Sequence, residues 1–362
     1  MRDNKLQAEQ IERVVVRGVN WVGDAVMTIP ALRELRRVLP HARITLATRP
    51  WAEGLFADAD FLDDLLIYDR RPRQLGAVVR QVRAWRRQRF DLALLFQNAF
   101  EAALIASAAR VPLRLGYATD GRRALLTHPL PVPVWRSERH ESFYYLNLVA
   151  GLERLLVGAS EIEQHEPVFN LRVSAERRRR ARALLAAQGA APERPLVALC
   201  PGSTNSRAKR WPADYYAALA DRLISEAGTE VVLVGSPEEL EVSQEVQRLM
   251  RQRAILLTGR TRLAEAVAVL SLAELLVTND TGPAHIAAAT NRPSLVIFGP
   301  TDPRTTRPLS AVAEIIRRPP DCAPCMLRDC PIDHRCMTGI TPAEVFARAS
   351  RLLKRDAVGV YG

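Results

Sequence analysis

Short apolar runs alternate with stretches of helical periodicity along the first half of the chain. Runs rich in leucine and β-branched residues predict strands, and amphipathic stretches at 25–38 and 74–88 predict helices between them. The predicted strands are 11–16, 43–47, 65–68 and 91–96. Alternation of strands and helices is typical of a parallel sheet with helices on both faces, so we expect a doubly wound α/β domain.

The second half of the chain repeats this scheme. Predicted strands lie at 196–200, 230–234, 254–257, 274–277 and 294–298, and predicted helices at 214–226, 238–250 and 283–289. The Pro-containing stretch 190–195 resembles a linker, so we expect two Rossmann-like doubly wound parallel-sheet domains, residues 1–189 and 190–340. A final amphipathic helix, 341–362, opens with Pro342 in its first turn, where proline is favoured.

The length of the chain indicates how many domains it forms, and its charge indicates which partners it attracts. At 362 residues the chain exceeds what one hydrophobic core usually serves, which favours two domains. A net charge of +11 attracts nucleic acid, phosphorylated ligands or acidic lipid headgroups. Part of this excess lies in the Arg-rich runs 83–89 and 177–182, which also fit solvated helix faces. The sequence contains no recognised nucleic-acid module, so we expect no nucleic-acid partner.

The first residues of the chain and its apolar runs do not suggest export or membrane insertion. The first thirteen residues are polar and charged, unlike a secretory signal. The longest apolar run, near 267–277, is interrupted by Ser271 and Glu274 and is shorter than the roughly 20 residues that span a bilayer. We therefore expect a cytoplasmic protein without a transmembrane helix.

A glycine-containing turn follows the first predicted strand. Gly18 and Gly23 have the spacing of a phosphate-binding loop, but Asp24 stands where that loop needs lysine. A carboxylate repels phosphate, yet at the carboxyl end of a parallel strand it is placed to accept a proton from a substrate hydroxyl. Asp24 is therefore a candidate general base. The alternative is an aspartate that caps the helix after it.

Two polar loops of the second domain look suited to a nucleotide diphosphate. The first, 201–212, combines Ser203 and Thr204 with Lys209, whose cation can neutralise charge on a departing diphosphate. The competing interpretation is a solvated basic loop before a helix. The second, 277–285, places polar residues at a strand end and a helix start, where backbone N–H groups bind anions. Its candidates are Asp280, Thr281, Gly282 and His285, although a single buried histidine is as often structural.

Acidic and sulfur-containing residues complete the set of candidates. Glu238 and Glu239 follow the second strand of this domain and suit either ribose hydroxyls or the N-terminus of a helix. Cysteines recur with C-x2-C-x4-C-x5-C spacing at Cys322, Cys325, Cys330 and Cys336. Disulfides are disfavoured in the cytosol, so a structural zinc or iron is weighed against a loop of reduced cysteines.

Taken jointly, several of these stretches resemble glycosyltransferase family 9, the ADP-heptose-dependent transferases. The matching stretches are 20–27, 97–100, 114–117, 201–203, 208–212 and 278–285, in the family's order. The resemblance runs from Val14 to about Leu353. The sequence of residues 21–27, Trp-Val-Gly-Asp-Ala-Val-Met, is similar to that of the heptosyltransferase II branch of the family.

The resemblance implies a GT-B fold, with two Rossmann-like domains facing across a cleft and the last helix packing back on the N-terminal domain. It also implies a metal-independent, inverting transfer of L-glycero-D-manno-heptose from ADP-heptose to heptose I of the lipopolysaccharide inner core, with no cofactor required. By the same resemblance, Asp24 and Lys209 are catalytic. The donor-binding residues are Ser203, Thr204, Lys209, Glu239, Asp280, Thr281, Gly282 and His285, and the acceptor-binding residues are Asn20, Asn98, Arg122 and Arg123.

The implied acceptor is a phosphorylated lipid A-Kdo-heptose, which gives the positive charge an anionic partner. We expect peripheral contact with the cytoplasmic face of the inner membrane. Two alternatives stay open. One is a transferase of the same family that acts on Kdo2-lipid A, an outer-core sugar or a protein, and the other is a sugar-nucleotide epimerase with a GT-B fold.

Overall fold

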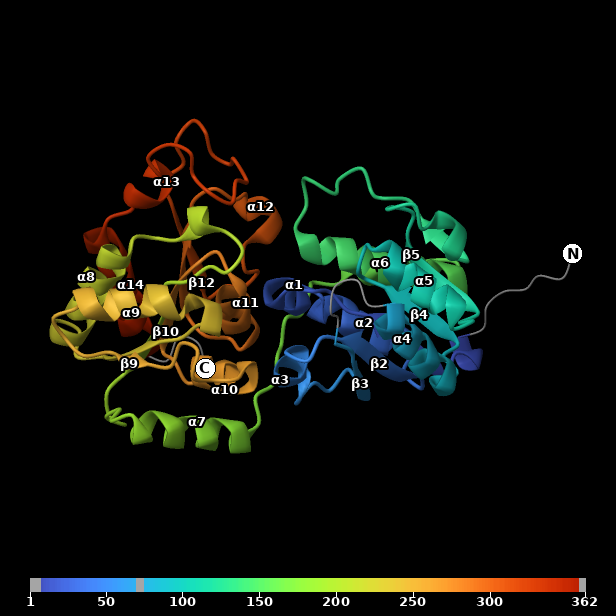
Figure 1. Cartoon of the computed structure of the whole chain (residues 1–362), viewed down its shortest axis with the longest axis horizontal. Helices are drawn as coiled ribbons and strands as arrows, with labels where there is room; N and C mark the ends of the chain where they lie inside the picture. The colour runs from blue at the N-terminus through green and yellow to red at the C-terminus, as the bar shows by residue number, and fades with distance from the viewer. Residues whose placement is uncertain (1–7, 70–74, 358–362) are drawn as a thin grey trace, which may run out of the picture. The chain divides into compact units, whose positions relative to one another are not determined.

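The computed structural model describes residues 8–69 and 75–357. The chain divides into two compact units, Met1–Phe169 and Asn170–Gly362. Each unit contains a six-stranded sheet in which every described strand pair is parallel, with helices along the sheet (Figure 1). The two doubly wound domains expected from the alternation of strands and helices are therefore confirmed.

The sheet of the first unit has the strand order β3-β2-β1-β4-β5-β6. Its strands are β1 (Arg13–Arg17), β2 (Arg43–Thr48), β3 (Asp64–Ile67), β4 (Leu92–Leu95), β5 (Leu113–Tyr117) and β6 (His128–Leu130). Strand β1 is central, because Val15 pairs with Thr45 on one side and with Ala93 on the other. The strand order reverses beside β1, so the turn after β1 lies where doubly wound sheets usually bind ligands.

Helices of the first unit supply the rest of its core. They are α1 (Val22–Met27), α2 (Ile29–Val38), α3 (Ala52–Phe56), α4 (Leu75–Gln88), α5 (Phe100–Ala108) and α6 (Glu141–Val157), with short 3-10 turns η1 (Ala8–Gln10), η2 (Arg123–Leu125) and η3 (Ile162–Gln164). Helix α2 packs against α6, and α4 against α5. The predicted start of α4 at Gln74 lies outside the described residues.

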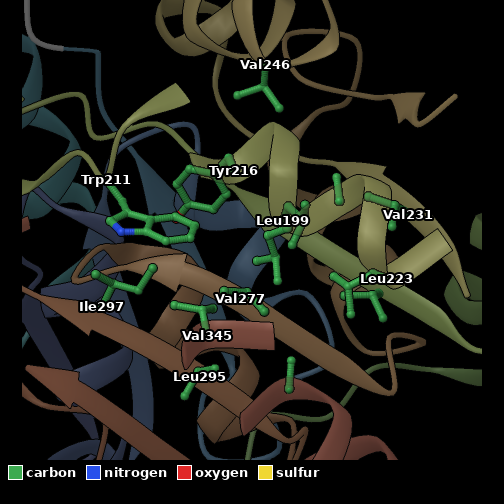
Figure 2. Packing of buried hydrophobic residues seen from close by; sticks show 14 of the residues in the cluster. Leu199, Trp211, Tyr216, Leu223, Val231, Val246, Val277, Leu295, Ile297 and Val345 are labelled. Carbon is green, nitrogen blue, oxygen red and sulfur yellow. The ribbon is translucent and has the colours of Figure 1, made fainter. Parts of the chain in front are cut away.

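The sheet of the second unit has the strand order β12-β11-β10-β7-β8-β9. Its strands are β7 (Leu196–Cys200), β8 (Glu230–Leu233), β9 (Ile255–Leu256), β10 (Leu275–Asn279), β11 (Ser294–Phe298) and β12 (Ala313–Arg317). The inner strands are buried on both faces, which explains their continuous apolar sequences. Figure 2 shows the core on one face, where Leu199, Val277 and Leu295 gather with Trp211 and Val345.

The helices of the second unit flank this sheet. They are α7 (Ala175–Ala187), α8 (Ala213–Ser225), α9 (Leu240–Leu249), α10 (Leu263–Leu270), α11 (Gly282–Ala289), α12 (Pro303–Thr306), α13 (Arg335–Thr338) and α14 (Pro342–Ala357), with 3-10 turns η4 (Arg207–Lys209) and η5 (Pro237–Glu239). Within the described residues, none of these helices or those of the first unit has the length and apolar composition needed to cross a membrane.

The boundary between the units lies earlier than the sequence predicted. The Arg-rich helix α7 packs against α10, and its Ala181 and Leu185 are buried. The helix is therefore part of the second unit, and the division falls at Phe169 and Asn170 rather than at Gly189. The Pro-containing stretch 190–195 is a connection inside the second unit.

The last helix also differs from its predicted place. Helix α14 packs against α8, β10 and β11, and its Val345, Ala349 and Leu352 belong to the core of the second unit. The predicted packing on the N-terminal domain is corrected accordingly, because the apolar face of the helix is used within its own unit. Residues 358–362 of the predicted helix lie outside the described residues.

Candidate active site

Three polar loops meet at one edge of the second sheet. They follow β7, β8 and β10, and they carry Ser203 to Lys209, Ser236 to Glu239 and Asp280 to Gly282. Carboxyl ends of parallel strands lie at the same edge of a sheet, so residues far apart in sequence come together there. The structure thus brings together the donor-binding residues predicted from separate segments.

Lys209 and Asp280 form the central contact of this edge. The ammonium Nζ of Lys209 donates to the Asp280 carboxylate Oδ2 at 2.8 Å and to the Asp280 carbonyl oxygen at 3.1 Å. The Thr301 hydroxyl donates to the same Oδ2 at 2.7 Å. The Asp280 side chain is 3% exposed and that of Lys209 is 24% exposed. The carboxylate therefore holds a cation in a fixed direction while leaving part of it open to solvent.

Asn279, the last residue of β10, joins the loop after β7 to the sheet. Its Oδ1 accepts from the Trp211 backbone N–H at 3.1 Å and from the Tyr216 hydroxyl at 3.2 Å. Its Nδ2 donates to the carbonyl oxygens of Pro201 at 2.9 Å and Gly202 at 3.1 Å. One buried amide thus fastens both ends of the loop that carries Lys209. Asn279 was not among the residues predicted from the sequence, although a polar residue at the end of an apolar strand was a usable signal.

Glu239 and Glu238 have different surroundings in the structure. The Glu239 carboxylate Oε2 accepts from the Ser236 backbone N–H at 2.8 Å in a capping box. Its side chain lies over Gly202, where an added Cβ would overlap the carboxyl group. Glu238 is exposed. Glu239 is therefore the glutamate that faces the loop after β7, and it also serves as a helix cap.

The loop after β10 presents the start of α11. Thr281 is the N-cap residue and makes no side-chain cap hydrogen bond to the helix. Its hydroxyl lies 3.3 Å from that of Thr278, and Gly282 begins the helix. The first N–H groups of a helix lack intrahelical partners and attract anions. His285, in the first turn, is 6% exposed, so it is a buried residue of this helix.

Ser203 and Arg210 show which residues shape the loop after β7 itself. Ser203 is 2% exposed, and its carbonyl oxygen accepts from Arg210 Nε at 3.3 Å and Nη2 at 3.0 Å. The Thr204 hydroxyl lies 3.4 Å from that of Ser236. Arg210 is thus used to hold the loop, whereas Lys209 points its charge at Asp280.

In the first unit, Asp24 lies in the first turn of α1. The helix begins at Val22 with Trp21 as its N-cap residue, so Asp24 is not the N-cap. A carboxylate in a first turn is favoured by the helix dipole. Burial chiefly, and then the charges of Asp24 and Glu141, raise the pKa of Tyr145 well above its ordinary value. Asp24 is therefore a half-buried carboxylate beside a buried tyrosine.

Arg122, which was predicted to bind the acceptor, is buried and hydrogen-bonded within its own unit. The side chain is completely buried, and burial lowers the pKa of its guanidinium. Its Nε donates to the Tyr117 carbonyl oxygen at 2.9 Å, and its Nη2 donates to Asn98 Oδ1 at 2.7 Å. Asn98 Nδ2 in turn donates to the Tyr144 hydroxyl at 2.7 Å. The amide of Asn98 is thus engaged within the unit, too.

Two predicted acceptor residues remain accessible. Arg123, in η2, is exposed, and Asn20, in the turn before α1, is half-buried. Arg122 and Arg123 are adjacent in sequence, yet one faces the core and the other faces solvent. The sequence pattern alone does not distinguish them, because two successive arginines in a turn look alike.

The five cysteines of the chain carry free thiols. Cys322 is exposed and Cys336 is buried, and burial followed by the neighbouring thiols raises the pKa of Cys336 to about 11. Across residues 8–69 and 75–357, no group of three or more His, Cys, Asp or Glu side chains is arranged to hold a metal ion.

Comparison with known proteins decides the family. Residues 78–335 match the model of glycosyltransferase family 9 (heptosyltransferase). The chain belongs to this family. Lipopolysaccharide heptosyltransferase 2 of Salmonella typhimurium is 31% identical over 96% of this chain and 100% of its own length, and that of Escherichia coli K12 is 30% identical over 95% and 99%.

The family 9 chain also resembles a solved structure of the family. The structure of E. coli ADP-heptose LPS heptosyltransferase II has a TM-score of 0.83 and 27% identity, and the match covers 95% of this chain and 99% of that one. This likeness, together with two parallel-sheet units, confirms the predicted GT-B fold. The resemblance to family 9 stated from sequence motifs is confirmed, and the protein is a glycosyltransferase.

Proposed function

We propose that this glycosyltransferase moves a heptose from ADP-heptose to heptose I of the lipopolysaccharide inner core. The observation that supports the proposal is the Lys209–Asp280 pair beside the start of α11, because a fixed cation next to a helix N-terminus would suit the diphosphate of a nucleotide sugar. The names of its relatives, lipopolysaccharide heptosyltransferase 2, point to the same donor and acceptor.

The donor would bind to the three loops of the second unit. In this proposal the N–H groups at the start of α11, with Thr281 and Gly282, receive the diphosphate, and Ser203 and Thr204 lie on the neighbouring loop. In the same proposal Glu239, whose side chain lies next to Gly202, bonds the ribose hydroxyls. Negative charge grows on ADP as the bond to the anomeric carbon breaks. A cation that Asp280 already orients stabilises this charge without reorganisation.

The acceptor step is assigned to the first unit. Asp24 would take the proton of the attacking heptose hydroxyl as its oxygen bonds to the anomeric carbon, and ADP leaves from the opposite face. One displacement of this kind inverts the anomeric centre. Because Lys209 and helix N–H groups neutralise the leaving diphosphate, the scheme uses no metal or other cofactor.

Acceptor choice is the part of the proposal that a direct assay tests. Purified protein is incubated with ADP-heptose and mono-heptosylated Kdo2-lipid A, and ADP release is compared with the mass gain of the lipid. Equal amounts of both are expected. Transfer to Kdo2-lipid A, an outer-core sugar or a protein instead would contradict the proposal that heptose I is the acceptor. A change of the nucleotide sugar without any acceptor would indicate an epimerase.

We also propose peripheral contact with the cytoplasmic face of the inner membrane. The loop before α6 exposes Val134 to 98% and Val132 to 44%, and the whole chain carries +11. Apolar side chains in a basic protein suit an anionic lipid surface. Flotation with phosphatidylglycerol vesicles is expected to exceed that with phosphatidylcholine. Replacing both valines by Asp should reduce it, whereas Val157→Asp, at another exposed valine, should not. Equal flotation of all variants would contradict this contact.

A structural metal at Cys322, Cys325, Cys330 and Cys336 is the remaining hypothesis about cofactors. It rests on four thiols within a short segment, and the transfer scheme does not need it. We expect Cys322→Ser with Cys325→Ser to change stability more than turnover. Elemental analysis of the purified protein tests the metal directly, and less than about a tenth of an equivalent of zinc or iron would exclude it.

A further inference from the structure

The segment from Met326 to His334, which we call the clamp segment, lies against the turn that carries Lys209. The Ala208 backbone N–H donates to the Arg328 carbonyl oxygen at 2.9 Å. The Ala208 carbonyl oxygen lies 2.6 Å from His334 Nε2. Both polar groups of the residue before Lys209 are therefore bonded to the clamp segment. Since a carbonyl oxygen only accepts, Nε2 must carry the proton of the imidazole.

Further contacts hold the same turn. The Ser206 hydroxyl lies 3.2 Å from the Arg328 carbonyl oxygen, and Arg207 Nε donates to Asp329 Oδ1 at 2.7 Å. The turn η4 is only three residues long, too short to satisfy its own backbone groups. Its shape therefore depends on partners from outside, and the clamp segment supplies them.

The clamp segment is itself anchored at the end of β11. The Met326 N–H donates to the Pro300 carbonyl oxygen at 2.9 Å. Just after the segment, Met337 and Cys336 are buried, and an added Cβ on Gly299 would overlap the Met337 side chain. Thr301, in the same stretch, donates to Asp280. The residues that follow β11 therefore contact both Asp280, which is the counterion of Lys209, and the clamp segment, which holds the turn before Lys209.

We propose that His334 is a positioning residue for transfer, which acts by holding the Ala208 carbonyl and so fixing where the Lys209 ammonium lies. This inference rests on the proposed role of Lys209 at the leaving diphosphate. His334 has a backbone φ of 58°, in the left-handed region that few residues other than glycine adopt at low cost. His334 is the residue immediately before α13, and its imidazole contacts the turn that carries Lys209.

The conformation of His334 suggests the most informative variants. His334→Gly removes the imidazole and keeps a residue that adopts positive φ readily. His334→Gln keeps a side-chain N–H donor of similar reach. The matched control is Arg335→Ala, because Arg335 is the next residue, is exposed and pairs with Asp333 rather than with the Lys209 turn.

We expect His334→Gly to lower kcat about 10-fold with the KM for the lipid acceptor within about twofold, because a misplaced cation weakens the transition state more than acceptor binding. His334→Gln should recover most of the loss, and Arg335→Ala should match the wild type. A purely structural role would lower the melting temperature without this recovery. If His334→Gly keeps wild-type kcat, or if Gln is no better than Gly, positioning by His334 is wrong.

A double variant separates this inference from the proposed function. If His334 acts through Lys209, then Lys209→Ala combined with His334→Gly should be about as slow as Lys209→Ala alone, on the order of 100-fold. Independent effects would multiply to about 1000-fold and would overturn the inference. If Lys209→Ala alone left kcat unchanged, the role of Lys209 at the diphosphate would fail instead.

Discussion

The Lys209 ammonium lies 2.8 Å from the buried carboxylate of Asp280, 71 residues further along the chain. Lys209 is partly exposed to solvent, whereas Asp280 is buried. The pair therefore presents to solvent a cation that a buried carboxylate holds in place. This arrangement differs from a surface ion pair, whose partners are both free to reorient in water. The contact places a fixed positive charge beside the start of α11, where an anion is favoured.

Replacing Lys209 by Ala should lower kcat by about 100-fold or more with a smaller effect on ADP binding, because the charge on the leaving diphosphate is greatest in the transition state. Lys209→Arg should recover only part of the rate, since a planar guanidinium does not match a site shaped around an ammonium. Steady-state kinetics with ADP-heptose measure both.

The matched control for this substitution is Lys354→Ala, on the exposed side of α14. Arg210 is not a neutral control, because its guanidinium holds the Ser203 carbonyl oxygen. If Lys209→Ala kept the wild-type kcat and altered only its salt dependence, the loop 201–212 would be a solvated basic loop and not a donor site.

Asp280→Asn should lower the free energy of unfolding by about 1 to 3 kcal/mol, because it removes the buried anion while Lys209 can still regain some water. It should also lower kcat, since the ammonium loses its fixed direction. Urea unfolding and kinetics measure the two effects. Asp214→Asn, at an exposed aspartate, is the control. Wild-type stability and rate in Asp280→Asn would show that the pair is not needed.

Asp24→Asn should reduce turnover by about 100-fold or more while leaving ADP binding and the melting curve nearly unchanged, as loss of a general base does. Asp214→Asn is again a close control, because Asp214 also lies in the first turn of a helix. Calorimetric titration with ADP separates binding from rate. Turnover within a few-fold of the wild type would show that Asp24 is not the general base and only interacts favourably with the dipole of α1.

Arg122 and Arg123 should behave in opposite ways. Arg122→Leu should destabilise the protein by about 3 kcal/mol or more, because it leaves buried carbonyl and amide oxygens without their donor. Arg123→Ala should keep the unfolding free energy within about 0.5 kcal/mol and raise the KM for the acceptor, an effect that high salt weakens. Equal stability of the two variants would contradict the burial of Arg122.

Several elements escaped sequence prediction for local reasons. Strand β5 contains Arg114 and Gly116, which interrupt its apolar pattern, and β6 is three residues long with Pro129 in its centre. Proline is tolerated in β6 because it is an edge strand of the sheet. Strand β12, also at an edge, includes Glu314 and is mostly half-buried. Edge strands need less apolar sequence, so periodicity detects them poorly.

What the sequence determined by itself is the alternation of strands and helices, the two sheets and the family. Continuous apolar runs report strands buried on both faces, and strand ends followed by polar residues report where a ligand binds in such sheets. These are local features, which the order of residues encodes directly. The segments with Asp24, Lys209 and Asp280 were found in this way.

Only the tertiary structure decided which side chains meet. It paired Lys209 with Asp280, placed Asn279 between the ends of one loop, and brought His334 against Ala208. It also buried Arg122 while exposing its neighbour Arg123, because the direction of a side chain depends on the fold around its turn. Contacts between residues 70 to 130 positions apart arise from strand order and packing, and no local pattern of the sequence records them.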